Sequence, residues 1–243
     1  MTKFLRQNAV WIPLSFVTIL IIMHLLSPEG CYGIIPRYQS GLRGILLAPL
    51  FHADWEHLAN NAVPLLVLGF LTITFYKSIA YLLFTAGWFI THTLVWLFAD
   101  LGLFGTEDHI GCHIGASGLV YLLAFFLFIS GVLRRSVPLI AVSLIVIFLY
   151  GSMLWGIFPQ EIINLGEKHS RMSWESHLFG ALTGAAFAVI FRRYGPQKKR
   201  WSWQQPNYDH SVDEELWERY LEKFPEDQNP PETEEKKKFK DLF

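Results

Sequence analysis

The sequence has few charged residues and only two cysteines. Charged residues make up 17% of its 243 positions, against roughly 25% in soluble domains. The formal net charge of −1 leaves no broad basic surface, so we expect no nucleic-acid partner. Cys31 and Cys112 are too few for a disulfide scaffold or a four-cysteine zinc site. These absences exclude an ordinary soluble enzyme, a nucleic-acid-binding protein and a disulfide-rich secreted domain.

Long apolar stretches are what the sequence has in place of charge. Hydrophobic residues reach 52% of the chain, and a bilayer core about 30 Å thick needs roughly 20 apolar residues per helix. The first stretch follows two basic residues as a secretion signal would, but its length and the absence of a small-x-small cleavage pattern favour a retained helix. The predicted spans are 9–26, 57–76, 79–98, 114–133, 137–158 and 174–191.

The distribution of lysine and arginine predicts the orientation of these spans. Cytoplasmic loops of membrane proteins collect positive charge. If both termini are cytoplasmic, ten basic residues near the spans lie inside and four lie outside. We therefore predict an all-α, polytopic membrane protein with six transmembrane helices and both termini in the cytoplasm.

The composition changes after residue 194. Residues 195–243 carry 12 acidic and 9 basic residues around one amphipathic stretch at 212–224, where apolar residues recur at helical spacing. We predict a membrane domain at 1–194 and a charged, largely flexible cytoplasmic tail at 195–243 with one short helix.

Three predicted spans begin with polar residues, which are costly in lipid and by default mark function. His57 and Asn61 lie four residues apart in the second span and so share one helix face. Ser117 opens the fourth span within Gly115-Ala-Ser-Gly, and His177 opens the sixth. All three helices run from the outside to the inside in the predicted topology.

These polar residues are predicted to lie at one depth. A helix rises about 1.5 Å per residue. Counted from the basic residues at the inner helix ends, Ser117, His177 and Asn61 lie roughly 25, 22 and 24 Å above the inner edge. Serine alone is common at helix contacts in membranes, but a serine, a histidine and an amide at equal depth can meet.

Acyl transfer is the chemistry that needs this set. A serine hydroxyl becomes nucleophilic when a base such as histidine removes its proton. The tetrahedral oxyanion then needs donors, which Asn61, His57 and the Ser117 N–H can supply. Glu175 points elsewhere on the helix from His177, so the sequence predicts a Ser–His dyad.

Small and aromatic residues complete the pattern. Tyr121 follows Ser117 by four residues and can stack on the base, whereas Gly180 and Gly184 form a small-residue strip. Such strips allow close helix approach in membranes. We expect this strip to pack the sixth span against the fourth.

With these motifs the chain resembles the rhomboid intramembrane serine proteases over about residues 9–193. The resemblance rests on His57-x-x-x-Asn61, on Gly115-Ala-Ser117-Gly with Tyr121, and on His177-x-x-Gly180-x-x-x-Gly184. Their order and the six-span layout match the basic bacterial form. The expected location is therefore the bacterial inner membrane, with the site open to the periplasmic side.

The resemblance implies a role for each matched residue. Ser117 would be the nucleophile and His177 the base and acid. His57, Asn61 and the Ser117 backbone would form the oxyanion hole, with His52 supporting the outer loop. The substrates would be single-span membrane proteins cut near the outer helix end. In one departure, Leu42-Arg43 stands where many members have Trp-Arg.

Several alternatives stay open at this point. A rhomboid-like protein can bind membrane helices without cutting them, although its usual mark is loss of the serine or histidine. A transporter is disfavoured by the absence of internal repeats. His109 and His113 flank Cys112 in an outer loop, but no complete ligand set is evident, so we expect no metal and no cofactor. A disulfide between Cys31 and Cys112 is permitted on the oxidising side.

Overall fold

The computed structural model describes residues 3–27, 29–101, 111–134, 137–150, 155–158, 173–196 and 201–228. Within these ranges the regular structure is helical, and the sole extended pairing is an isolated antiparallel bridge between Ile34 and His113. The chain divides into two compact units, Met1–Lys198 and Lys199–Phe243.

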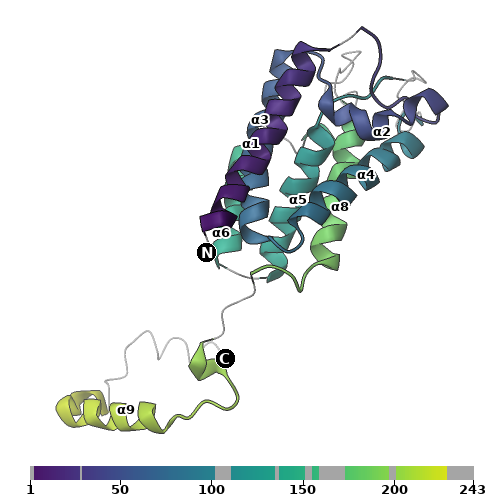
Figure 1. Ribbon diagram of the computed structural model, residues 1–243. Helices are drawn as coiled ribbons and strands as arrows, with labels where there is room; N and C mark the ends of the chain where they lie inside the picture. The colour runs from purple at the N-terminus through teal and green to yellow at the C-terminus, as the bar shows by residue number, and fades with distance from the viewer. Residues whose placement is uncertain are drawn as a thin grey trace. The chain divides into compact units, whose positions relative to one another are not determined.

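Six long helices lie within the described residues of the first unit (Figure 1). They are α1 (Lys3–Leu25), α3 (Trp55–Phe75), α4 (Ala80–Phe98), α5 (Ser117–Arg134), α6 (Val137–Tyr150) and α8 (Trp174–Ile190). Among the described residues, α3, α4 and α5 are long and apolar enough to cross a membrane. Shorter apolar helices cover Ala9–Leu25 and Val137–Val146.

Helix α5 is the centre of this bundle. It packs most extensively against α8 and also contacts α6, α3 and α4, while α1 lies along α3 (Figure 1). Of an 18-residue apolar stretch of α5, 67% is buried inside the protein, against 28% of the corresponding stretch of α4. Four of its large side chains are at most 1% exposed, namely Leu119, Leu122, Leu123 and Phe126. The helix that begins at Ser117 is therefore shielded by protein on nearly every side.

Two predicted span boundaries are wrong in detail. The fourth span was predicted to begin at residue 114, but α5 begins at Ser117. Gly115 adopts a left-handed backbone with φ of +109°, which an α-helix cannot contain. The fifth span was predicted to reach residue 158, but α6 ends at Tyr150 and residues 155–157 form a separate 3₁₀ turn.

A structured loop joins α1 to α3. It contains η1 (Gln39–Gly41), α2 (Gly44–Leu47) and η2 (Ala48–Leu50). Arg43 donates a hydrogen bond of 2.8 Å to the Cys31 carbonyl and lies 5.1 Å from the Tyr32 ring centre. Trp88 of α4 donates to the Ile45 carbonyl at 2.9 Å. Arg43 thus anchors the loop even though the preceding residue is leucine.

The second unit holds η5 (Ser202–Gln204), α9 (Ser211–Lys223) and η6 (Pro225–Gln228). Helix α9 is amphipathic, and its apolar residues Leu216, Trp217 and Tyr220 are exposed within this unit. Its helical residues match the amphipathic stretch predicted at 212–224.

Candidate active site

Ser117 is the first residue of α5, and a tightly held turn precedes it. The Gly115 N–H donates to the Ala48 carbonyl at 2.9 Å, and the Ala116 N–H donates to His52 Nε2 at 3.4 Å. The Ala116 carbonyl accepts the first bonds of the helix. Because the first N–H groups of a helix have no partner inside it, the backbone at Ser117 presents donors at the helix N-terminus.

His57 and Asn61 of α3 face this turn. A Cβ atom placed on Gly115 would lie 2.6 Å from His57 Nε2 and 3.5 Å from Asn61 Nδ2. Asp54 caps α3 by accepting the His57 N–H at 2.7 Å, which fixes the helix start. The structure therefore brings both predicted oxyanion donors to the residue two positions before Ser117.

The Asn61 amide has an unusual environment. Asn61 is only 4% exposed, and its Nδ2 is buried without a hydrogen-bond partner in the described part of the chain. Most buried polar groups have a partner, so each exception needs an explanation. The unpaired Nδ2 therefore leaves a hydrogen-bond donor available beside the turn before Ser117.

His177 is held from two sides. It is 5% exposed, and its ring stacks on Tyr121 with the centroids 4.2 Å apart and the planes within 9°. This stacking is the one that the spacing of Tyr121 from Ser117 predicts. His177 Nδ1 donates to the Gly156 carbonyl at 2.8 Å. Since a carbonyl only accepts, the proton of the neutral ring is on Nδ1, and Nε2 keeps a lone pair for use as a base.

Glycines bring α5 and α8 into backbone contact. A Cβ atom on Gly180 would lie 2.2 Å from the Gly118 carbonyl oxygen, and one on Gly184 would lie 2.2 Å from that of Leu122. Gly118 directly follows Ser117, and Gly180 is one turn after His177. The predicted packing of the two spans through small residues is thus confirmed, and it sets Ser117 beside the start of α8.

His52 supports the turn as a neutral acceptor. It is 3% exposed, and its ring lies 5.0 Å from that of His57 in an edge-to-face arrangement. The pKa of His52 is lowered from 6.5 to about 3, mainly by burial and to a smaller extent by the nearby His57 and His24. An uncharged ring can accept the Ala116 N–H at Nε2, so this pKa shift and the hydrogen bond agree.

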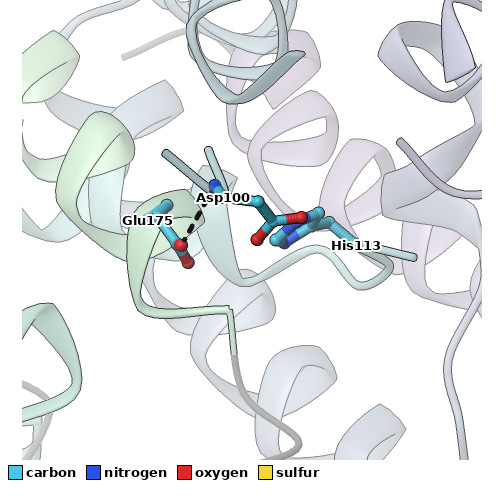
Figure 2. A group of neighbouring side chains, drawn as sticks. All are labelled: Asp100, His113 and Glu175. Carbon is cyan, nitrogen blue, oxygen red and sulfur yellow. Dashed lines mark hydrogen bonds and ion pairs between the residues drawn. The ribbon is translucent and has the colours of Figure 1, made fainter. Parts of the chain in front are cut away.

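A second polar cluster covers the ends of α4 and α8. His113 Nε2 lies 3.1 Å from Asp100 Oδ2, and the Asp100 N–H donates to Glu175 Oε1 at 3.5 Å (Figure 2). His113 Nδ1 forms a 2.7 Å hydrogen bond with the hydroxyl of Ser173, the residue that caps α8. Glu175 is therefore directed away from His177, as the sequence predicts.

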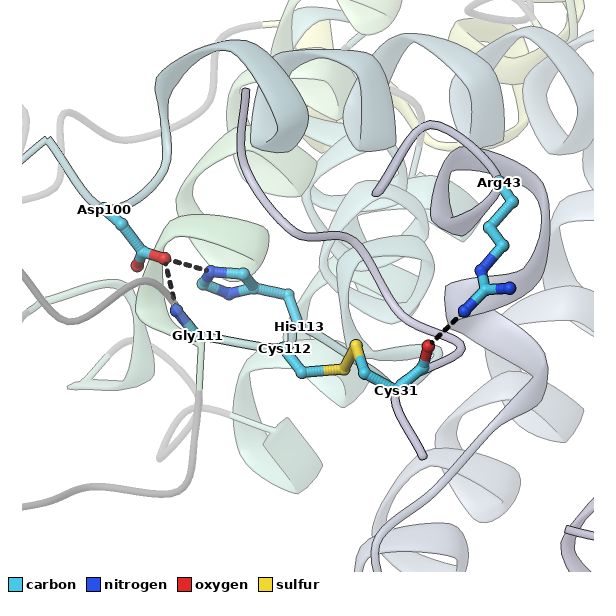
Figure 3. The surroundings of a disulfide bond; sticks show 6 residues. All are labelled: Cys31, Arg43, Asp100, Gly111, Cys112 and His113. Atoms are coloured by element: carbon cyan, nitrogen blue, oxygen red, sulfur yellow. Dashed lines mark hydrogen bonds and ion pairs between the residues drawn. A yellow bond between two sulfur atoms is a disulfide. The ribbon is translucent and has the colours of Figure 1, made fainter. Parts of the chain in front are cut away.

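The disulfide left open by the sequence is present in the structure. Cys31 and Cys112 are bonded with their Cα atoms 6.0 Å apart, across 81 residues of sequence (Figure 3). Next to it, the Ile34 N–H donates to the His113 carbonyl at 2.9 Å, and the His113 N–H returns a bond of the same length. Together they tie the loop after α1 to the segment that leads into Ser117.

Sequence reasoning missed several residues that hold this site. The Gly156 and Ala48 carbonyls act through the backbone, for which the sequence carries no signal. Ser173 could have been found, because serine just before an apolar run is a helix N-cap pattern. Asp100 and Glu175 meet His113 only through the fold. His109, which the sequence analysis discussed with His113 as a possible metal ligand, lies outside the described residues.

The arrangement can perform nucleophilic chemistry on a carbonyl. It combines a serine at a helix N-terminus, a histidine whose free nitrogen can take a proton, and amide and imidazole donors around the preceding turn. Activated serine, base and oxyanion donors are the three parts that acyl transfer requires. These features define a helical membrane protein in which a half-buried serine and a buried histidine open two adjacent helices.

Comparison with known proteins identifies the family. A model of the Rhomboid domain matches residues 39–194, and the chain belongs to the rhomboid family, the family of intramembrane serine proteases that also has inactive members. An uncharacterized protein of Mycobacterium tuberculosis is 36% identical over 193 residues, covering 76% of this chain and 75% of the relative. An uncharacterized protein of Mycobacterium leprae is 35% identical over 196 residues, with 75% and 73% covered. The chain is thus an all-helical integral membrane protein of this family.

Proposed function

We propose that this protein is an intramembrane serine endopeptidase that cleaves transmembrane helices near their outer ends. The observation that carries the proposal is the state of His177. Its Nδ1 proton is held by the Gly156 carbonyl, its ring lies flat on Tyr121, and its helix touches the residue after Ser117. With the proton held on Nδ1, Nε2 keeps the lone pair that a general base for a serine nucleophile needs.

The reaction follows from this geometry. Ser117 Oγ attacks the scissile carbonyl carbon while His177 Nε2 takes the hydroxyl proton. The carbonyl oxygen becomes an oxyanion that accepts hydrogen bonds from the Ser117 N–H, from His57 and from Asn61 Nδ2. His177 then gives its proton to the leaving amine, which frees one peptide fragment and leaves an acyl ester on Ser117.

Water completes the cycle. His177 removes a proton from a water molecule, which attacks the ester carbonyl, and the same donors stabilise the second oxyanion. When this intermediate collapses, the carboxylic acid leaves and His177 returns the proton to Ser117 Oγ. The substrate helix must unwind locally, because a helix holds its carbonyls in its own hydrogen bonds.

We further propose the predicted topology for the whole chain. It has six spans with both termini in the cytoplasm, a protease domain at 1–194 and a tail at 195–243. This topology agrees with the excess of basic residues on the inner side. This topology opens the site to the outer face of a bacterial inner membrane, and the Cys31–Cys112 disulfide is compatible with that oxidising side. The partners are then single-span membrane proteins and the surrounding lipid.

A non-cleaving, helix-binding rhomboid-like protein is the competing function. The presence of both Ser117 and His177 speaks against it, because a binding protein needs neither. The test is cleavage of a single-span substrate by purified protein in detergent, beside Ser117→Ala and His177→Ala. Cleavage by the wild type alone, near the outer helix end, is expected. If no substrate is cut and a fluorophosphonate probe does not label Ser117, the binding function is favoured.

A further inference from the structure

The cluster of Asp100, His113 and Glu175 lies outside the proposed catalytic machinery. One ligand atom from each residue lies within 4.8 Å of the others. The three come from different segments, namely the residues after α4, the bridge before α5 and the first turn of α8. His113 and Glu175 are each 9% exposed. Figure 2 shows the Asp100 carboxylate beside the His113 ring, with Glu175 on the other side of Asp100.

Within the described chain, the carboxylates of this cluster have no direct ion pair with a lysine or arginine, although the Arg37 charge is near enough to favour the ionised form of Asp100. His113 is the one ion-pair partner of Asp100 among the described residues, and the Gly111 N–H also donates to Asp100 Oδ2. Arg37 lies nearby but donates to the backbone carbonyls of Ala99 and Asp100. Buried carboxylates are costly unless they are paired or bind a metal.

Glu175 provides an independent observation. It is nine-tenths buried and forms no ion pair within the described ranges. Its carboxylate accepts backbone N–H groups, its own and that of Asp100, the latter at 3.5 Å. Its carboxylate is nevertheless aimed into the cluster (Figure 2). A buried, weakly held carboxylate beside a second carboxylate is the arrangement that a cation stabilises.

The surroundings of His113 and Asp100 resemble the outer shell of a metal site. A metal-bound histidine uses one ring nitrogen for the metal and donates the other N–H to an acceptor that fixes the ring. With Nε2 facing Asp100, Nδ1 lies 2.7 Å from the Ser173 hydroxyl, which can be that acceptor. The Gly111 N–H likewise holds Asp100 Oδ2 at 2.8 Å (Figure 3).

We propose that Asp100, His113 and Glu175 bind a divalent transition-metal cation, with Zn²⁺ as the ion best suited. One imidazole and two carboxylates are ligands that Zn²⁺ accepts at about 2.0–2.2 Å, and water can fill the fourth position. Tetrahedral bonds of that length set the ligand atoms roughly 3.3 Å apart. The 3.1 Å between His113 Nε2 and Asp100 Oδ2 is close to this spacing, and the Glu175 carboxylate, within 4.8 Å of the other two ligand atoms, would have to move closer to complete it.

The bound ion would act on structure rather than on the peptide bond. His113 precedes Ser117 by four residues, and Glu175 precedes His177 by two. An ion shared by them joins the segment leading into the nucleophile to the first turn of the helix that carries the base. The proposal departs from the sequence-based expectation of no metal, which considered the outer-loop histidines without the two carboxylates.

The test is Zn²⁺ binding by the purified full chain in detergent, after chelator treatment and its removal. Affinity is measured by competition with a chromogenic chelator, and coordination by the visible absorption of Co²⁺ in place of Zn²⁺. We expect one ion per wild-type chain and at least about 10-fold weaker binding by Glu175→Gln, which keeps the shape of the side chain but removes a charged ligand. Glu56→Gln is the matched control, because Glu56 is an exposed acid in the first turn of α3.

Two further variants separate this site from the other histidines. His57→Ala should bind Zn²⁺ as the wild type does, whereas Ser173→Ala should bind about 10-fold more weakly because it removes the partner of His113 Nδ1. Thermal unfolding without metal checks that each variant is folded. The proposal is overturned if the wild type binds no stoichiometric ion, or if Glu175→Gln binds as tightly as Glu56→Gln. Neither outcome depends on whether the protein cleaves peptides.

Discussion

The two sides of Ser117 differ in how fully their polar groups are satisfied. On the α8 side, His177 has its Nδ1 proton on the Gly156 carbonyl and its ring on Tyr121. On the α3 side, Asn61 has a buried amide nitrogen with no partner among the described residues. The His177 side thus has its hydrogen bond already formed in the free protein, whereas the Asn61 amide on the other side has no acceptor among the described residues.

This difference matches what the proposed reaction asks of each side. A base must have the correct tautomer before substrate arrives, so its hydrogen bond is made in advance. An oxyanion donor is most useful when its hydrogen bond forms only as negative charge develops. Leaving a buried donor unpaired costs about 1–3 kcal/mol of stability, which is a reason to expect that Asn61 serves the chemistry.

The largest expected effect comes from removing the nucleophile or the base. Ser117→Ala and His177→Ala should each lower substrate cleavage by about 10³-fold or more, because nucleophile and base act as one unit and neither is effective without the other. Cleavage is followed on gels with a single-span substrate, and Ser117 labelling with a fluorophosphonate probe. Ser130→Ala, a buried serine further along α5, is the control and should cleave normally. Undiminished cleavage by Ser117→Ala would rule out the proposed nucleophile.

The unpartnered donor offers a sharper test of the comparison. Asn61→Leu should lower kcat by about 10²–10³-fold, the usual effect of losing one oxyanion donor. The same change should leave thermal stability equal or slightly higher, since an apolar side chain of similar size replaces an unsatisfied group. A residue that serves only the fold would show the opposite pattern. Lower stability with unchanged kcat would therefore assign Asn61 a structural role.

The contact between α5 and α8 controls how the two sides meet. Gly180→Ala would place a methyl group 2.2 Å from the Gly118 carbonyl oxygen, so the helices must separate. We expect a loss of about 1–3 kcal/mol in stability, typical of overpacking, and roughly 10-fold slower cleavage at the displaced site.

Gly111→Ala is the matched control for this substitution. A Cβ atom there would meet its nearest neighbour, His113 Nε2, at 3.7 Å, an ordinary contact. Thermal unfolding and cleavage rates are measured for both variants. Equal behaviour of Gly180→Ala and Gly111→Ala would show that the close approach of α5 and α8 is not needed for the site.

Much of this architecture could be predicted from the sequence because it depends on local patterns. Apolar length gave the helices, and the small residues at Gly180 and Gly184 gave the pairing of α5 with α8. Ser117 and His177 could be proposed as candidates because polar residues are rare in spans and these two were predicted to lie at matching depth. The same reasoning placed Tyr121 on the face where its ring meets His177.

The remaining features depend on chain segments that meet only in the fold. Because Gly115 has a left-handed backbone conformation, α5 begins at Ser117 and not at residue 114. The dihedral angles of a glycine in an apolar run cannot be predicted from the sequence. The Gly156 carbonyl acts through the backbone, so its partnership with His177 has no sequence mark. Asp100 and Glu175 lie 75 residues apart, and no spacing rule links them to His113.

The smallest expected effect concerns the pH dependence of the α3 side. His52 is neutral in the folded protein, since burial and its neighbours His57 and His24 lower its pKa from 6.5 to about 3. Between these two values the unfolded chain binds a proton that the folded chain does not. The linkage relation then requires the unfolding free energy to fall as the pH drops below about 6.5.

His52→Gln should make that decline shallower, because glutamine does not titrate and its Oε1 can still accept the Ala116 N–H. The measurement is the thermal unfolding midpoint in detergent between about pH 4.5 and 7.5, the range in which the linkage acts. At the upper end the two proteins should differ little, since the hydrogen bond is kept and one such bond contributes only about 1 kcal/mol. Parallel curves would mean that His52 is not a neutral acceptor in the fold, and the turn before Ser117 would then need another support.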